Sequence, residues 1–181
     1  MQVSMLFVLA RSRRLVTAFA LVSSGAVLVG CSLVGDNTGL PPFTDPAKQS
    51  YATNTGVTLA TMTRVNAQVY TQDIIVGTGR TVAIGDSISV YYVGRLTGGF
   101  QFDGRARPAT TFATVLDTTR LIKGWVNGLP GMKVGGTRRM LVGPEFAYRF
   151  STVRDINGNV SIPPNSVLVF DVELVEALAR P

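Results

Sequence analysis

The segment Ser87-Ile-Ser-Val-Tyr-Tyr-Val-Gly-Arg-Leu96 decides the fold, because its residue types alternate as in a β-strand with one buried face. The period of two divides the strand into an inner and an outer face. The inner face holds Ile88, Val90, Tyr92, Gly94 and Leu96. The outer face holds Ser87, Ser89, Tyr91 and Arg95. We therefore expect Tyr92 to point into the core and Tyr91 to point outward.

Three further segments are rich in β-branched and aromatic residues, namely 69–76, 137–142 and 167–175, and Gly-rich turns separate them. In the last segment the buried face is expected to comprise Leu168, Phe170, Val172 and Leu174. Asp171 and Glu173 alternate with these residues and share the opposite face. This placement favours a solvated surface over an acid/base pair for the two carboxylates.

One stretch has helical spacing. Between 121 and 128 the apolar residues recur three and four positions apart, at Leu121, Ile122, Trp125, Val126 and Leu129. A single short helix beside a mostly antiparallel sheet predicts an α+β fold, in which the sheet curves around the helix.

Composition excludes several kinds of chemistry. The chain has no histidine, and its one cysteine, Cys31, follows an N-terminal apolar segment. Imidazole-dependent triads, zinc sites and thiol redox chemistry in the folded part are therefore not expected. The formal charge of +6 falls to +3 beyond Cys31, where 14 basic residues face 11 acidic ones. The basic residues form no stripe interleaved with aromatics, so we expect no nucleic-acid partner.

The N-terminus has the pattern of a secretory signal, in which Arg11, Arg13 and Arg14 precede about fifteen apolar residues. Leu28-Val-Gly-Cys31 resembles the lipobox of bacterial lipoproteins, which implies an acylated Cys31 and a lipid-anchored location in the bacterial cell envelope. A plain transmembrane anchor with an incidental cysteine is the alternative, although the run is shorter than the ~20 residues of a span.

These features divide the chain into a signal peptide at 1–30, a tether at 31–56 and a folded domain at 57–181. Gly, Pro, Asn, Ser and Thr dominate the segment from Ser32 to Gly56, which has no apolar period. We therefore predict that it is a flexible linker. Repeats and low-complexity tracts are absent.

Seven blocks in the folded part resemble, in order and spacing, those of the FKBP-type peptidyl-prolyl cis/trans isomerases. They are Val90-Tyr-Tyr-Val-Gly94, Gly99-Phe-Gln-Phe-Asp103, Leu121-Ile-Lys-Gly-Trp125, Gly131-Met-Lys-Val-Gly135, Pro144-Glu-Phe-Ala-Tyr148, Ile162-Pro-Pro164 and Leu168-Val-Phe-Asp-Val-Glu-Leu174. Agreement of several separate blocks is far more specific than a lone motif. The resemblance implies an FKBP-like fold and rotation of Xaa-Pro bonds in exported polypeptides.

The resemblance also implies a set of site residues around a pocket with the indole of Trp125 at its floor. The catalytic group comprises Tyr92, Phe102, Asp103, Trp125 and Tyr148, and the substrate-binding group comprises Phe112, Leu121, Ile122, Ile162 and Phe170. Phe146 is expected to be structural. No cofactor and no metal are implied, and the expected ligands are proline-containing polypeptides and macrolides. A non-catalytic peptide-binding or chaperone module on the same fold is the alternative, and a structural lipoprotein is a third reading.

Several positions differ from the family pattern. Pro108 stands where an arginine often pairs with the pocket aspartate, and Arg105 and Arg107 are close enough in sequence to replace it. Arg149 stands where a glycine usually follows the pocket tyrosine. The flap before Ile162 is longer than in the minimal domain, and its Asn157-Gly158 pair predicts a hairpin turn.

Overall fold

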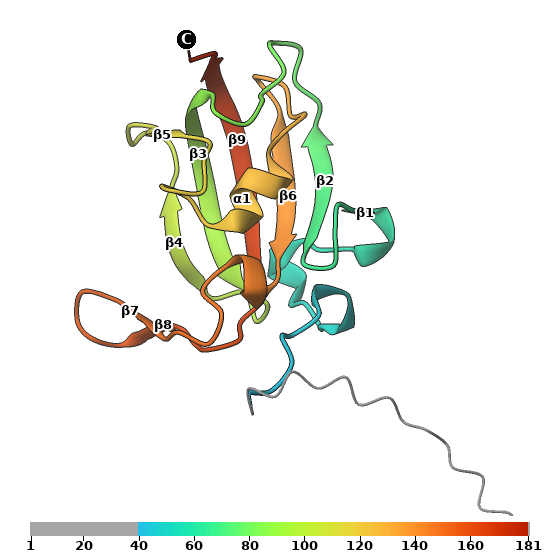
Figure 1. The fold of residues 1–181 in the computed structure, drawn as a ribbon, viewed down its shortest axis with the longest axis vertical. Coiled ribbons are helices and arrows are strands. Elements are labelled where there is room, and N and C mark those ends of the chain that lie inside the picture. The colour runs from blue at the N-terminus through green and yellow to red at the C-terminus, as the bar shows by residue number, and fades with distance from the viewer. Residues whose placement is uncertain (1–39, 181) are drawn as a thin grey trace, which may run out of the picture. The chain divides into compact units, whose positions relative to one another are not determined.

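The computed structural model describes residues 40–180, in which an antiparallel sheet packs on a single α-helix (Figure 1). The strands are β1 (Thr63–Arg64), β2 (Val69–Ile75), β3 (Ser87–Leu96), β4 (Gln101–Arg105), β5 (Phe112–Val115), β6 (Thr137–Val142), β7 (Val153–Arg154), β8 (Val160–Ile162) and β9 (Leu168–Leu178). The helix is α1 (Lys123–Gly128), and four 3₁₀ turns are η1 (Pro46–Lys48), η2 (Thr53–Thr55), η3 (Leu59–Thr61) and η4 (Pro144–Phe146).

The sheet has the order β1-β2-β6-β9-β3-β4, with β5 paired to β3, and all its pairs are antiparallel. Its centre is the long pairing of β3 with β9, which runs from Ser87 opposite Leu178 to Leu96 opposite Leu168. Strands β7 and β8 form a separate hairpin. Its turn contains Asn157-Gly158, as predicted, and Gly158 donates its N–H to the carbonyl of Asp155.

The predicted strand at 87–96 is confirmed residue for residue, and the predicted strand at 137–142 is confirmed as well. The helix begins two residues later than predicted, because the backbone of Ile122 is extended (φ −59°, ψ 145°). Strand β9 continues to Leu178, beyond the predicted end at Val175, because its last residues still pair with the start of β3.

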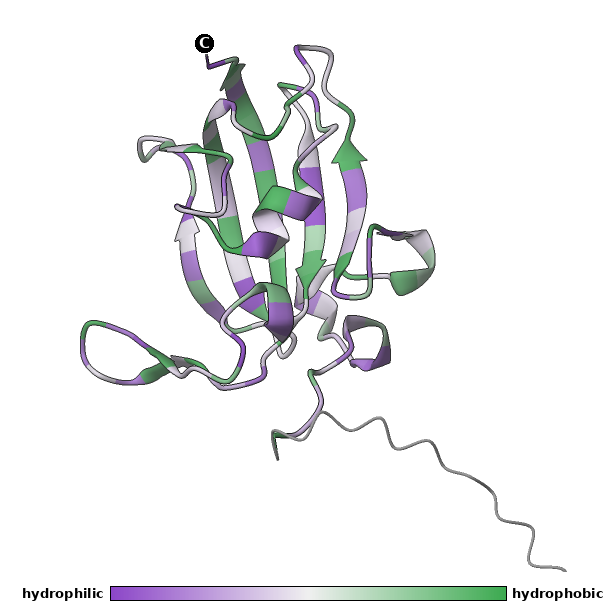
Figure 2. Ribbon diagram, in the orientation of Figure 1, coloured by the Kyte–Doolittle hydropathy of each residue, from purple (hydrophilic) through white to green (hydrophobic). Residues whose placement is uncertain are grey.

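The core lies between α1 and the sheet face that α1 covers. Figure 2 shows hydrophobic and hydrophilic residues alternating along β9, and the inward ones, Leu168, Phe170, Val172 and Leu174, are all buried as predicted. Trp125, Val126 and Leu129 contribute the helical side of the same cluster. Gly124 lets the helix approach β6, because an added Cβ there would collide with Val142.

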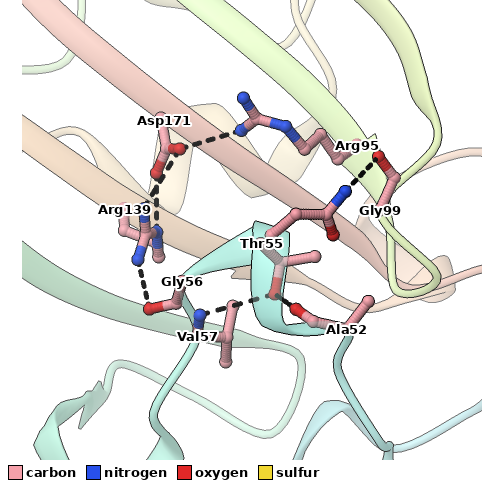
Figure 3. Close-up of polar contacts among 9 residues, drawn as sticks. Ala52, Thr55, Gly56, Val57, Arg95, Gly99, Arg139 and Asp171 are labelled. Carbon is pink, nitrogen blue, oxygen red and sulfur yellow. Dashed lines mark hydrogen bonds and ion pairs between the residues drawn. The ribbon is translucent and has the colours of Figure 1, made fainter.

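The predicted tether is wrong from residue 40 onward, because residues 40–56 belong to the same compact unit as the sheet. Ala52 donates its N–H to the carbonyl of Thr97 at 2.8 Å, and Pro46 and Thr55 are buried. Figure 3 shows Arg139 joining the carbonyl of Gly56 to the carboxylate of Asp171. The segment is thus a strap held on the domain, although its composition is that of a linker.

None of the helices among residues 40–180 has the length and apolar character needed to cross a membrane. The predicted signal peptide and Cys31 lie outside the described residues.

Candidate active site

A pocket of about 180 Å³ opens between α1 and the strands β3, β4, β5 and β9. It is lined by Tyr92, Phe102, Asp103, Phe112, Arg120, Leu121, Ile122, Trp125, Tyr148 and Phe170. Nine of these ten residues were predicted from the sequence to form one site, and the structure brings those nine together. Arg120 was not predicted, since nothing in its sequence context distinguishes it from other exposed arginines.

Trp125 is the centre of the aromatic wall. Its ring meets those of Tyr92, Phe112 and Phe170 edge to face, with centroids 5.3, 6.3 and 5.5 Å apart and interplanar angles of 84 to 86°. Phe102 continues the cluster by packing on Phe170 at 5.7 Å. Edge-to-face pairs at these distances have favourable quadrupole interactions and fix the orientation of each ring. The pocket floor is therefore preformed and apolar.

Gly94 makes room for two of these rings. A Cβ added at this position would lie 2.7 Å from Cζ of Phe102 and 3.0 Å from Cε1 of Phe170. Both distances are too short for carbon atoms, so the position of Phe102 depends on the absence of a side chain on β3.

Asp103 and Tyr92 form the polar edge of the pocket. The Tyr92 hydroxyl donates to Oδ2 of Asp103 at 2.8 Å, while Oδ1 accepts the N–H of Gly104 at 2.8 Å. Burial, reinforced by this hydrogen bond to a carboxylate, raises the pKa of Tyr92 far above its ordinary value. Both oxygens of Asp103 are occupied, which fits an orienting carboxylate better than a general base.

The expectation that Arg105 or Arg107 replaces the family arginine beside Asp103 is not met. Within residues 40–180 neither guanidinium forms an ion pair with Asp103. Arg107 instead pairs with Glu173 at 2.8 Å and stacks over the ring of Tyr91, on the face of the sheet away from α1. Ala106 and Arg107 both line the hollow on that face, and Arg107 does not line the pocket.

Tyr148 follows η4 and closes the pocket from the side of the flap. Its hydroxyl makes no hydrogen bond to any residue within 40–180, and 36% of the residue is exposed. Burial first, and then the charge of Asp103, raises the pKa of Tyr148. A protonated phenol with a free O–H is a hydrogen-bond donor ready for a ligand.

Ile162 is the one predicted site residue that does not line the pocket. It is 2% exposed and packs in the main core cluster. The alternation of β8 turns its side chain inward, so a contact between this side chain and substrate is not supported. Phe146 packs against the same core and does not line the pocket, as expected.

Asp171 and Glu173 alternate with the buried residues of β9, as predicted, but both are held in ion pairs and do not form a simply solvated face. Asp171 accepts from Arg139 at 2.7 Å and from Arg95 at 3.0 Å, and Glu173 accepts from Arg107 (Figure 3 shows the first two arginines). A larger hollow of about 370 Å³ lies on this face. The charged residues that line it, Arg107, Asp171 and Glu173, all form ion pairs.

The residues of 40–180 contain no cluster of His, Cys, Asp and Glu able to hold a metal ion. The site consists of an aromatic floor, the free hydroxyl of Tyr148, the oriented carboxylate of Asp103 and the exposed guanidinium of Arg120. Such a site can desolvate a planar group and donate a hydrogen bond to it.

The sequence model of the FKBP-type peptidyl-prolyl cis-trans isomerases matches residues 78–175, which include every residue of the pocket. The chain belongs to this family. The match covers more than half of the chain and leaves the strap outside.

Similar proteins match slightly more than half of the chain. FK506-binding protein 4 of Chaetomium thermophilum is 44% identical over 100 residues, which are 55% of this chain and 19% of that protein. FK506-binding protein 1 of Dictyostelium discoideum is 37% identical over 99 residues, which are 55% of this chain and 88% of that protein. The first relatives are thus much longer proteins, of which this FKBP-type chain spans about a fifth to a quarter.

Among solved structures, FkpA from Escherichia coli superposes with a TM-score of 0.57 at 32% identity, covering 67% of this chain and 53% of that one. The likeness confirms the expected FKBP-like architecture of an antiparallel sheet and one short helix.

Proposed function

We propose that this chain catalyses cis/trans isomerisation of Xaa-Pro bonds in polypeptides. The observation that carries the proposal is the pocket itself, in which the indole of Trp125 and its aromatic neighbours face the free hydroxyl of Tyr148.

Rotation about an Xaa-Pro bond breaks amide resonance against a barrier of ~18–20 kcal/mol, and it takes tens of seconds or longer in water. The planar amide has a large dipole, and the twisted amide is less polar. An apolar cavity therefore stabilises the twisted form relative to the planar one, in comparison with water. This reaction needs no proton transfer, nucleophile or metal. The aromatic and hydroxyl side chains of the pocket are therefore the types of group that it requires.

Each polar group of the pocket has a defined part in this proposal. The Tyr148 hydroxyl donates to a substrate carbonyl and holds the peptide in the pocket. Asp103 fixes the ring of Tyr92 through its 2.8 Å hydrogen bond, and Tyr92 in turn packs on Trp125. The proline ring occupies the apolar floor, where aromatic contact replaces water.

The test is NMR exchange spectroscopy of an Xaa-Pro peptide with the chain from Leu40 onward. We expect saturable acceleration of exchange, and we expect Tyr148→Phe to reduce kcat/KM about fivefold, the loss of ~1 kcal/mol for one neutral hydrogen bond. Tyr91→Phe is the matched control, since this tyrosine lies outside the pocket, and it should leave the rate unchanged. A folded protein that produces no acceleration would refute the proposal.

A peptide-binding or chaperone module without catalysis is the second candidate. The observation that favours it is the absence, within residues 40–180, of an arginine paired with Asp103, a departure from the family pattern that changes the electrostatics of the pocket. Saturable peptide binding without faster exchange would establish this reading. Because relatives are named as FK506-binding proteins, we also propose macrolides as ligands, detectable through the fluorescence of Trp125.

We further propose that acylated Cys31 anchors the chain to a bacterial envelope membrane, where exported polypeptides are its substrates. The lipobox pattern supports this, and incorporation of labelled palmitate that is lost in Cys31→Ala tests it.

A further inference from the structure

The strap contacts the loop that carries Tyr148. The ring of Phe43 stacks on that of Phe150 with centroids 4.9 Å apart and an interplanar angle of 16°. The guanidinium of Arg149 lies over the same Phe43 ring, 5.1 Å from its centroid. Phe43 therefore packs against both residues that directly follow Tyr148.

Asn165 ties the two segments together by hydrogen bonds. Its side-chain carbonyl accepts the N–H of Thr44, its own backbone carbonyl accepts the Thr44 hydroxyl, and its side-chain amide donates to the carbonyl of Pro42, at 3.0, 3.0 and 3.3 Å. The backbone N–H of Asn165 donates to the carbonyl of Arg149 at 2.7 Å. Asn165 thus forms hydrogen bonds with Pro42, Thr44 and Arg149.

The backbone beside Tyr148 adopts a conformation that needs support. Arg149 has a φ of +56°, in the left-handed region that residues other than glycine rarely adopt. The Tyr148 hydroxyl adds no hydrogen bond to any residue from 40 to 180. The support comes from backbone bonds of the loop and from the contacts of Arg149, Phe150 and Asn165 with the strap.

We propose that Pro42–Thr44, which we name the latch, is a positioning device for Tyr148. The latch holds Arg149 in its left-handed conformation and so aims the Tyr148 hydroxyl into the pocket. It lies outside the family-matched residues 78–175, and it supplies a partner for the arginine that replaces the usual glycine. The inference rests on the proposed isomerase function for its kinetic consequence, but the structural coupling of latch and loop does not.

The test is a double-mutant cycle in the full chain with Phe43→Ala and Tyr148→Phe. If the latch acts through Tyr148, Phe43→Ala lowers kcat/KM about threefold to fivefold in the parent chain and less than twofold in the Tyr148→Phe chain. Phe43→Tyr retains the stacked ring and should restore the parent value. Equal losses in both backgrounds would overturn the inference, because the two residues would then act independently.

Two controls separate positioning from general stability. Val69→Ala truncates a fully buried side chain that does not line the pocket, and it should lower the melting temperature without changing kcat/KM. Leu40→Ala truncates an exposed residue of the same strap and should change neither quantity. A Phe43→Ala chain that behaves like Val69→Ala in both measurements would show a merely structural contact.

Hydrogen exchange provides a readout that does not need activity. The amide of Ser151, bonded to the carbonyl of Tyr148, and that of Asn165, bonded to Arg149, should exchange at least tenfold faster in Phe43→Ala, while amides in β3 and β9 stay protected. Unchanged exchange at both amides would overturn the latch. A parent chain without isomerase activity would instead refute the proposed function, and the exchange result would still decide the coupling.

Discussion

At the scale of single residues, the pocket depends on where side chains are absent as much as on where they are present. Gly94 is buried on β3 and lies so close to the rings of Phe102 and Phe170 that an added methyl group would collide with both. An aromatic cluster of this density has little free volume to absorb an added atom. The shape of the pocket wall is therefore fixed by the backbone of β3.

Gly94→Ala should push Phe102 toward the 180 Å³ pocket and occupy part of it. We expect the free energy of unfolding to fall by ~1–3 kcal/mol, which is the usual cost of overpacking, and kcat/KM to fall tenfold or more. Urea unfolding and exchange NMR measure the two effects. Gly98→Ala is the matched control, because an added Cβ there meets nothing within 4 Å. Parent-like activity in Gly94→Ala would show that Phe102 does not shape the site.

The sequence was sufficient to predict the pocket residues because their periodicity and block order are local signals. Trp125, Tyr92 and Phe170 lie on elements whose inward faces follow from the 2.0 and 3.6 periods. Arg120 and the side-chain partners of Asp103 could not be predicted, since they depend on where loops cross in space. Ile162 was assigned to the pocket by block position alone, and its burial in the core shows the limit of that reasoning.

At the scale of elements, the start of β3 is fixed by an ion pair between a buried carboxylate, Asp86, and a partly exposed arginine, Arg80. Asp86 is 4% exposed, and its carboxylate accepts from both terminal nitrogens of Arg80, at 2.6 and 2.9 Å, and from the N–H of Ala83 at 2.7 Å. The hydrogen bonds from Arg80, the largest cause, hold the pKa of Asp86 below its ordinary value, although burial acts in the opposite direction. The pair closes the segment between Arg80 and Asp86, which directly precedes β3.

Asp86→Asn should therefore destabilise the fold at pH 7, and the difference from the parent chain should shrink in acid. A carboxyl group whose pKa is lower in the folded state contributes stability above its unfolded pKa of ~3.9 and loses that contribution as the pH falls toward the folded value. Urea unfolding at pH 7, 4 and 3 measures the change. Glu145→Gln, at an exposed position, is the control. A difference that stays constant down to pH 3 would contradict the assigned role of the ionised carboxylate.

The strap shows why composition alone cannot separate a linker from an ordered element. Residues 40–56 have the Gly, Pro, Asn and Thr content of a flexible tether, yet Pro46 and Thr55 are buried. The strap is ordered by hydrogen bonds to residues that lie far away in the sequence, namely Thr97, Arg139 and Asn165. No local pattern predicts contacts across such separations, so the predicted start of the domain at residue 57 was seventeen residues too late.

At the scale of the whole molecule, one FKBP-type domain and its strap provide a preformed apolar pocket beside a single hydroxyl donor. In the proposed function, catalysis comes from desolvation and orientation, and no group exchanges a proton with the substrate. The pKa of Tyr92 and that of Tyr148 are both raised, so both phenols stay protonated well above neutral pH. The ionisation state of these two groups therefore does not change in the physiological range.

The most direct test of this account is the pH dependence of kcat/KM for an Xaa-Pro peptide without titratable groups, measured by exchange NMR between pH 6 and 9. We expect a profile that is flat within about twofold, because neither phenol titrates in this interval. A bell-shaped profile, or a slope approaching a tenfold change for each pH unit, would contradict the account by revealing an acid or a base in the rate-determining step.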